Sequence, residues 1–249
     1  MTGTEEPTDD RNSIPLFLTP EHPCSYLEGE AARTLFVDPK LQLSQSRYQQ
    51  LTNAGFRRSG SNLYRPHCER CQACQPSRIP VAEFQPRRRQ RRIIKRNQDL
   101  ELKREPARFT RAFFALYERY IAARHQEGGM YPADEDQYQS FLLCDWAESE
   151  FLVGYSGSEA VSIAVTDHLT DGLSAIYTFF EPTLSVRSLG ALSILKQIEW
   201  ARELKLDYLY LGYAIRNSPK MRYKFDYQPL EVLTGAGWQP CSTSSAANR

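Results

Sequence analysis

Three cysteines stand at a repeated two-residue spacing, Cys68, Cys71 and Cys74, and a fourth, Cys24, precedes them. Cysteines two residues apart can direct their sulfur atoms at one ion, so this spacing is typical of a zinc site or an iron–sulfur cluster. A closed tetrahedral site needs a fourth ligand, and Cys24 is the best candidate, ahead of the nearby histidines. Unligated thiols in a small domain are the alternative interpretation. The pattern predicts a metal-braced, loop-rich unit near the N-terminus.

Two groups of basic residues indicate an anionic partner. Arg57, Arg58, Ser59 and Gly60 are expected to form a turn, and the guanidinium fork is suited to a carboxylate or a phosphate. A solvated turn is the alternative. The second group is a run of seven basic residues within ten positions: Arg87, Arg88, Arg89, Arg91, Arg92, Lys95 and Arg96. The whole chain has a formal charge of only +1, so such a block favours a local RNA contact over a solvated face.

The composition argues against a membrane protein or a secreted protein. A run of about 18 apolar residues, which a membrane span needs, is absent from the sequence. Residues 1–13 are acidic and polar and lack the regions of a signal peptide. We therefore expect a cytoplasmic protein, in which clustered cysteines bind metal more often than they pair. Cys144 and Cys241 stand apart from the cluster and are expected to be ordinary structural residues.

The order of the expected elements indicates two domains between flexible tails at 1–13 and 241–249. Residues 14–105 form a cysteine-rich N-terminal domain that includes the basic segment. Residues 106–240 form a second domain in which strands, a helix and a further strand follow one another. The expected fold class is therefore α/β (α+β), with a mixed sheet in the C-terminal domain.

Hydrophobic spacing and turn residues place the individual elements. Helices are expected over 43–55, 106–124, 135–147 and 185–206, the first of them ended by Gly55. Strands are expected over 97–106, 151–156, 160–169, 173–182 and 207–213.

The segment 177–190 is expected to run from a strand through a loop to the start of the 185–206 helix. Free backbone amides and the helix dipole favour an anion there. N-acetyltransferases hold the coenzyme pyrophosphate with an Arg/Gln-x-x-Gly-x-Gly/Ala loop, and this chain has RSLGAL at 187–192. Leu192 departs from that pattern at its last position. This departure weakens the interpretation as a coenzyme A site, but the start of the helix can still bind an anion.

Six long motifs occur in order: HPCSYL, GFRRSGSNLYRPHCERCQAC, GLSAIYTFFEP, SLGALSILKQIEWAREL, YLYLGY and KMRYKFDYQPLE. The set closely resembles the aminoacyl-tRNA–protein transferases, from about Leu16 to Pro240. That family comprises the eukaryotic arginyltransferases and the bacterial aspartate/glutamate leucyltransferases. The resemblance implies an N-acetyltransferase fold for the C-terminal domain. It also implies transfer of an amino acid from aminoacyl-tRNA to a protein N-terminus, which marks that protein for degradation.

The short chain looks like the bacterial group, whose donor is leucyl-tRNA and whose acceptors begin with Asp or Glu. The eukaryotic members carry a second cysteine soon after the first and an adjacent cysteine pair further on. Here Leu27 follows Cys24, and the later cysteines are spread out. Zinc and an iron–sulfur cluster therefore both stay open. No cofactor is expected for transfer itself, and neither DNA nor a membrane is an expected partner.

Within this resemblance the candidate residues take hypothetical roles. We expect Arg57, Arg58 or Ser59 to read the acidic side chain of the acceptor. The transfer site is expected at Tyr177, Phe179 and Glu181, although core packing explains the two aromatic residues equally well. The terminal phosphate of the tRNA is expected near Ser188, Leu189, Gly190, Lys220, Tyr223 and Lys224.

Three competing interpretations remain open from the sequence. One is a metal-braced RNA-binding protein without catalysis, which would use the cysteines and the basic run. The other two are transferases with arginyl-tRNA or acetyl coenzyme A as donor.

Overall fold

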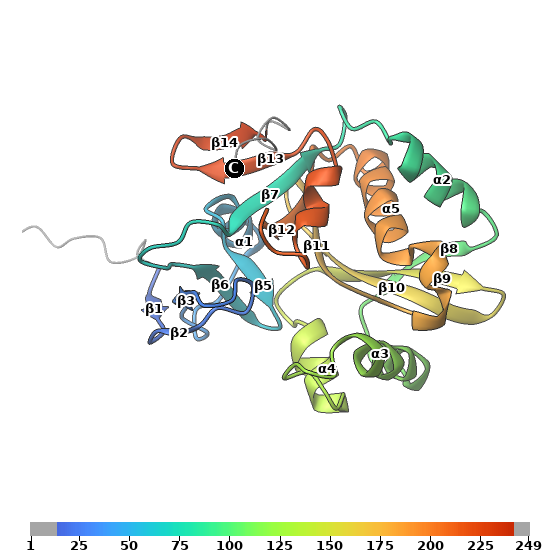
Figure 1. Ribbon diagram of the computed structural model, residues 1–249, viewed down its shortest axis with the longest axis horizontal. Helices are drawn as coiled ribbons and strands as arrows, with labels where there is room; N and C mark the ends of the chain where they lie inside the picture. Colours follow the sequence, from blue (N-terminus) through green and yellow to red (C-terminus); the bar gives the residue numbers. More distant parts are fainter. Residues whose placement is uncertain (1–13, 242–249) are drawn as a thin grey trace, which may run out of the picture.

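The structure is a computed structural model that describes residues 14–241 of the 249-residue chain (Figure 1). The tails expected at 1–13 and 241–249 lie outside the described residues, except for Cys241. The described chain forms an N-terminal unit, on the left in Figure 1, and a larger unit built on an eight-stranded sheet. In residues 14–241, no helix is both long enough and apolar enough to cross a membrane.

The N-terminal unit is a small sheet covered by one helix. Its four strands lie in the order β1 (Leu16–Leu18), β4 (Thr34–Val37), β6 (Asn62–Pro66) and β5 (Arg57–Ser59). Strands β2 (His22–Pro23) and β3 (Ala31–Ala32) pair to form a separate two-stranded sheet. Helix α1 (Gln45–Asn53) starts at Ser44, whose hydroxyl accepts the backbone N–H of Arg47, and Gly55 follows it with φ +89°.

The large sheet is antiparallel except for one central pair. Its strands lie in the order β14 (Gly237–Pro240), β13 (Glu231–Thr234), β7 (Gln75–Pro80), β12 (Tyr208–Ala214), β11 (Gly172–Phe180), β10 (Glu159–His168), β9 (Ser149–Ser156) and β8 (Glu101–Pro106). Strands β11 and β12 are parallel, and they pair only over 172–174 and 208–210. Beyond these residues the two strands separate, which opens a gap in the middle of the sheet.

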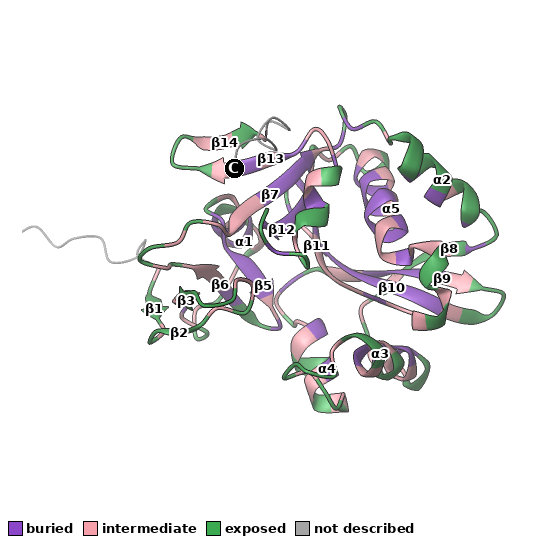
Figure 2. Ribbon diagram, in the orientation of Figure 1, coloured by how far each residue is buried: buried purple, intermediate pink, exposed green. Residues whose placement is uncertain are grey.

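Helices cover both faces of this sheet. Helices α5 (Leu189–Glu203) and α2 (Arg88–Arg96) lie on one face, above it in Figure 1, and helices α3 (Arg111–Arg124) and α4 (Glu135–Leu142) lie on the other. The 3-10 turns η2 (Pro182–Arg187) and η3 (Arg222–Asp226) follow β11 and β12. Each face has its own core. One contains Leu195 and Ile198 of α5, and the other contains Leu116 and Tyr117 of α3. Figure 2 shows the sheet and α5 as largely buried, whereas α2 is mostly exposed.

A third core joins the two units. Tyr48 and Leu51 of α1 and Leu63 of β6 pack against Leu169 and Tyr210 of the larger unit. Buried apolar contacts between units resist relative motion, because separating them would expose that surface to water. The N-terminal unit is therefore fixed against the sheet.

Most expected elements are present, and the mixed α/β class is confirmed. Three expectations differ from the structure. The expected turn at the paired arginines is strand β5, because the reversal comes at Gly60 and Ser61, and Gly60 has φ +57°. The basic run, for which the sequence suggested no element, forms α2. Strands β7 and β8 lie in the large sheet, so the boundary expected at residue 106 does not separate the two units. Strand pairing between segments distant in sequence leaves no local signal.

Candidate active site

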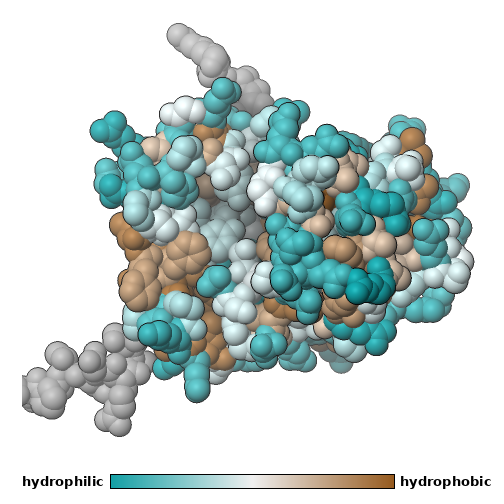
Figure 3. Space-filling model, turned by 90° about the horizontal axis from the view of Figure 1, so that it is seen from below, coloured by the Kyte–Doolittle hydropathy of each residue, from teal (hydrophilic) through white to brown (hydrophobic). Residues whose placement is uncertain are grey.

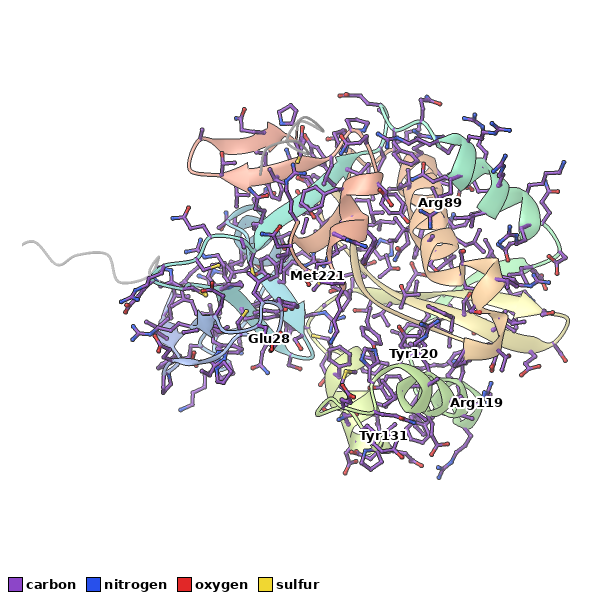
Figure 4. All side chains as sticks on the ribbon, in the orientation of Figure 1. Glu28, Arg89, Arg119, Tyr120, Tyr131 and Met221 are labelled. Carbon is purple, nitrogen blue, oxygen red and sulfur yellow. The ribbon has the colours of Figure 1, made fainter. Side chains whose placement is uncertain are left out.

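A cavity of about 550 Å³ opens where α2, α5, β11 and η3 meet. In Figure 4, Arg89 of α2 and Tyr120 of α3 lie on its two sides. Its lining residues are Arg87, Arg89, Gln90, Ile93, Tyr120, Thr178, Phe180, Ser188, Gly190, Ala191, Ile194, Tyr223, Asp226 and Tyr227. Arginines therefore stand on one wall, and aromatic and aliphatic side chains form the others. A cavity of this size with apolar walls and a few charged groups is the usual form of a ligand site.

Alternation along β11 decides which side chains reach the cavity. Thr178 and Phe180 line it, whereas Tyr177 and Phe179 belong to the core cluster on the α3–α4 face. Side chains of successive strand residues point to opposite faces, so the two pairs cannot share one face. Phe179 is fully buried, and its ring packs edge-on against Tyr117. Tyr177 and Phe179, expected at the transfer site, therefore lie on the opposite face of the strand.

Glu181, also expected at the transfer site, is held by its own neighbours. Its carboxylate accepts from the backbone N–H and hydroxyl of Thr183 and from Nε of Arg119, at 2.8 Å. Burial acts to raise the pKa of Glu181, but the hydrogen bonds from Thr183 and Arg119 outweigh it and lower the pKa. A carboxylate so stabilised in its ionised form is a poor proton acceptor. Glu181 caps η2 and is absent from the cavity lining.

The start of α5 forms the cavity wall beside the arginines. Ser188, in the left-handed conformation at φ 56°, precedes the helix, and Gly190 lies in its first turn. A Cβ at position 190 would lie 3.3 Å from the Phe180 ring, so glycine lets α5 approach β11 closely. Leu189, expected at a tRNA phosphate with these two residues, is instead fully buried in the core.

Helix α2 presents its basic residues to solvent next to the cavity. The seven basic residues of 87–96 are all exposed, and Arg87 and Arg89 line the cavity. Gln90 supports the start of the helix, because its Oε1 accepts the backbone N–H of Arg87 at 2.8 Å. The only ion pair found for these residues within 14–241 joins Arg89 to Asp226 at 4.0 Å. The charge of α2 is thus largely available to an anion.

The three residues expected near the tRNA phosphate from the segment after β12 separate in the structure. Tyr223 lines the cavity and is 44% exposed. Lys220 is exposed and, after burial, is the next cause that lowers the pKa of His125. Lys224 is buried, and its Nζ donates to the backbone oxygen of Tyr213 at 2.7 Å. Lys224 is therefore enclosed by the protein and is absent from the cavity lining, unlike Tyr223.

The paired arginines of β5 occupy different environments. Arg58 donates from Nε and Nη2 to the carboxylate of Asp167, at 2.6 and 2.8 Å, and both side chains are fully buried. Arg57 reaches the point where β11 and β12 separate, and donates to Ser174 Oγ and to the backbone oxygen of Ala175. Because Arg58 is buried and already paired with a carboxylate of the same chain, it is a core residue and not an acceptor candidate. Arg57 and the half-buried Ser59 remain as acceptor candidates.

The four clustered cysteines lie within electrostatic reach of one another. Burial and the neighbouring Cys24, Cys68 and Cys71 raise the pKa of the Cys74 thiol to about 12. Thiol ligands suit zinc or an iron–sulfur cluster by type. However, no group of three or more metal-ligating side chains among residues 14–241 is placed to hold one ion. The thiols in this arrangement do not form a closed site, and the metal stays a prediction.

Several cavity residues received no role from the sequence, although all but Tyr120 lie within the motifs quoted above. Tyr120, Thr178, Phe180, Asp226 and Tyr227 are of this kind. The alternation of side chains along β11 is the one signal that could have identified Thr178 and Phe180. A strand that buries Tyr177 and Phe179 on one face must present these two residues on the other. Tyr120 and the η3 residues reach the cavity only through tertiary packing.

Two family models match the chain. "Arginine-tRNA-protein transferase, N terminus" matches residues 22–92, and "Arginine-tRNA-protein transferase, C terminus" matches residues 112–234. The chain is 53% identical over 230 residues to the aspartate/glutamate leucyltransferase of Alcanivorax borkumensis, which covers 92% of this chain and 95% of that protein. It is 50% identical over 226 residues to the protein of the same name from Hahella chejuensis, with 91% and 97% covered.

Among solved structures, that of L-PGS from Bacillus licheniformis aligns with a TM-score of 0.44 and 13% identity. The alignment covers 70% of this chain and 51% of that one.

Proposed function

Because this chain belongs to the arginine-tRNA-protein transferase family, we propose that it transfers leucine from leucyl-tRNA to the N-terminal aspartate or glutamate of acceptor proteins. Its full-length relatives at about half identity are named for that leucyl transfer. The chain is thus an aminoacyltransferase whose substrates are a tRNA and a protein. The leucine added to the acceptor would then mark it for degradation.

The character of the cavity is the observation that best supports leucine as the transferred group. Tyr120, Phe180 and Ile194 give it apolar walls. Among the described residues, Asp226 is the only carboxylate in the lining, and its side chain is 65% exposed beside Arg89. An arginyl group would need a buried anion for its guanidinium, since an unpaired buried charge is costly. A leucyl side chain gains stability from the same walls by leaving water.

The walls next to the arginines suit the end of a tRNA. Exposed basic residues on α2 provide the charge that attracts a phosphate backbone. The start of α5, at Ser188 and Gly190, adds backbone N–H groups and the positive end of a helix dipole. We therefore place the tRNA backbone along α2 and the terminal phosphate at the start of α5, with the leucyl ester in the cavity.

The reaction needs little beyond positioning. The α-amine of the acceptor attacks the ester carbonyl of the leucyl group, an amide bond forms, and the ester C–O bond breaks. The terminal ribose oxygen of the tRNA leaves and takes up the proton that the amine loses. An α-amine has an ordinary pKa near 8, so an appreciable neutral fraction exists at neutral pH. Holding the two reactants together then supplies most of the acceleration.

One assay separates this function from its competitors. The protein is mixed with a peptide beginning with Asp and with labelled leucyl-tRNA, arginyl-tRNA or acetyl coenzyme A. We expect label to move only from leucyl-tRNA. Transfer from another donor would replace the proposed donor, and RNA binding with no transfer from any donor would favour a non-catalytic RNA-binding protein.

A pair of variants at Thr178 tests the cavity as the leucyl site. Thr178→Asp places a carboxylate among the apolar walls and should reduce leucine transfer by about 100-fold or more, because the charge must be desolvated. Thr178→Val keeps the volume and should change transfer by less than about 10-fold. Equal activity of both variants would contradict the placement of leucine in this cavity.

A further inference from the structure

Two cationic side chains are buried next to each other behind the cavity wall. Arg57 of β5 is 8% exposed and Lys224 of η3 is 6% exposed. Their charges interact: burial first, and then Arg57, lower the pKa of Lys224 to about 7. Two like charges packed together away from water oppose folding. Such an arrangement needs a reason.

Neither side chain has an anionic partner among residues 14–241. Arg57 donates to Ser174 Oγ at 2.9 Å and to Ala175 O at 2.8 Å, and Lys224 donates to Tyr213 O at 2.7 Å. All three acceptors are neutral. The neighbouring Arg58, by contrast, is matched by the carboxylate of Asp167. The fold therefore pairs one buried cation of β5 with a carboxylate, and leaves the other, beside Lys224, without an anionic partner among residues 14–241.

The groups around the two cations are polar but carry no carboxylate. Tyr64 and Tyr213 lie within electrostatic reach of Arg57, and the thiol of Cys74 lies within electrostatic reach of Lys224. Burial raises the pKa of both tyrosines, so their hydroxyls stay neutral. A small anion entering here would meet a fixed positive charge in a partly water-free setting, where charge-assisted hydrogen bonds are strongest.

The position of the pair suits the first side chain of an acceptor. Arg57 fills the gap where β11 and β12 separate, and a Cβ at Gly212 would lie 3.1 Å from its Nε. Nζ of Lys224 lies 5.9 Å from the ring centre of Tyr223, and Tyr223 lines the cavity. The Tyr223 ring thus borders both the proposed leucyl site and the Lys224 ammonium group. That arrangement matches an acceptor residue whose α-amine and side-chain carboxylate must be held at the same time.

We propose that Arg57 and Lys224 together bind the side-chain carboxylate of the acceptor's N-terminal Asp or Glu and so determine acceptor specificity. This inference rests on the proposed function and adds Lys224, which comes from the opposite end of the chain from the arginine. The carboxylate supplies the missing negative charge, and Asn or Gln, which cannot supply it, are rejected.

Variants of Lys224 test the proposal. Lys224→Met and the more polar Lys224→Gln are compared with Lys40→Met, which removes an exposed lysine of the N-terminal unit. Two quantities are measured for peptides that begin with Asp or Asn. The first is kcat/KM for leucine transfer, and the second is peptide affinity without tRNA, from fluorescence anisotropy. Thermal melting and the affinity for leucyl-tRNA show whether each variant is folded and still binds its donor.

We expect the unaltered protein and Lys40→Met to prefer Asp strongly. In both Lys224 variants, the ratio of kcat/KM for the Asp peptide to kcat/KM for the Asn peptide should fall about 10- to 100-fold, which is the effect of losing one charged hydrogen bond. The affinity for leucyl-tRNA should change little. Arg57→Lys, which keeps the charge and loses the fork, should lower the ratio less. An unchanged ratio in folded Lys224 variants would overturn the proposal and leave leucine transfer intact. Lys224-dependent binding of the Asp peptide without transfer from leucyl-tRNA would support the site and overturn the proposed function.

Discussion

Replacing Asp167 with asparagine should destabilise the protein more than any single surface change. The carboxylate is fully buried and accepts four hydrogen bonds: from Arg58 Nε and Nη2, from Tyr48 Oη at 2.7 Å and from Ser149 Oγ at 2.6 Å. Asparagine keeps the shape but removes the charge, so Arg58 is left buried and unmatched. Breaking a buried ion pair on one side costs about 3–5 kcal/mol. For a chain of this size we expect the melting temperature to fall by about 10 °C.

Urea unfolding followed by far-UV circular dichroism measures the loss, with the exposed Asp145→Asn as the matched control. The double variant Arg58→Met/Asp167→Leu removes both charges and should recover a large part of the stability, because no unpaired charge remains. Two results would refute the reasoning. One is a loss below about 1 kcal/mol in Asp167→Asn. The other is a double variant as unstable as the sum of its single changes.

Two further predictions concern the β5–β6 turn and α2. Gly60→Ala should cost about 2–4 kcal/mol in urea unfolding, because φ is +57° and the new Cβ would lie 2.0 Å from the backbone oxygen of Ser140; Gly157→Ala, with a similar φ and open space, should cost only about 1 kcal/mol. Arg88→Ala/Arg92→Ala should weaken tRNA binding and reduce the salt dependence of log K by about 0.7–0.9 per lost phosphate contact. An unchanged salt dependence would remove α2 from the tRNA interface.

Local patterns were enough to predict most of the secondary structure. The apolar spacing of α3 and α5 and the β-rich runs of β9 to β12 are confirmed nearly to their ends. Ser44 and Gly55 bracket α1 as capping rules require. These signals are local because each depends only on residues a few positions apart. Strand β7, which reads as part of a cysteine-rich loop region, gave no such signal for its place in the large sheet.

Only part of the candidate site could be predicted from the sequence. The start of α5 and the basic run were singled out, and both border the cavity. On β11, Tyr177 and Phe179 pack against α3, as the core-packing alternative expects, and Thr178 and Phe180 take the cavity side. The sequence could not distinguish Arg57 from Arg58. Their difference depends on Asp167, which is more than a hundred residues away.

The place of β7 has a consequence for the order in which the chain is assembled. This strand lies between β12 and β13, and both partners are made long after it, with β12 starting about 130 residues later. At about 5–20 residues per second, β7 must wait roughly 6–26 seconds on the ribosome before its first neighbour exists. During that time the backbone N–H and C=O groups of β7 that later pair with β12 and β13 face water or a chaperone. A shortened chain that begins after β7 would instead leave β12 and β13 with unmatched edges, which makes such fragments prone to aggregate.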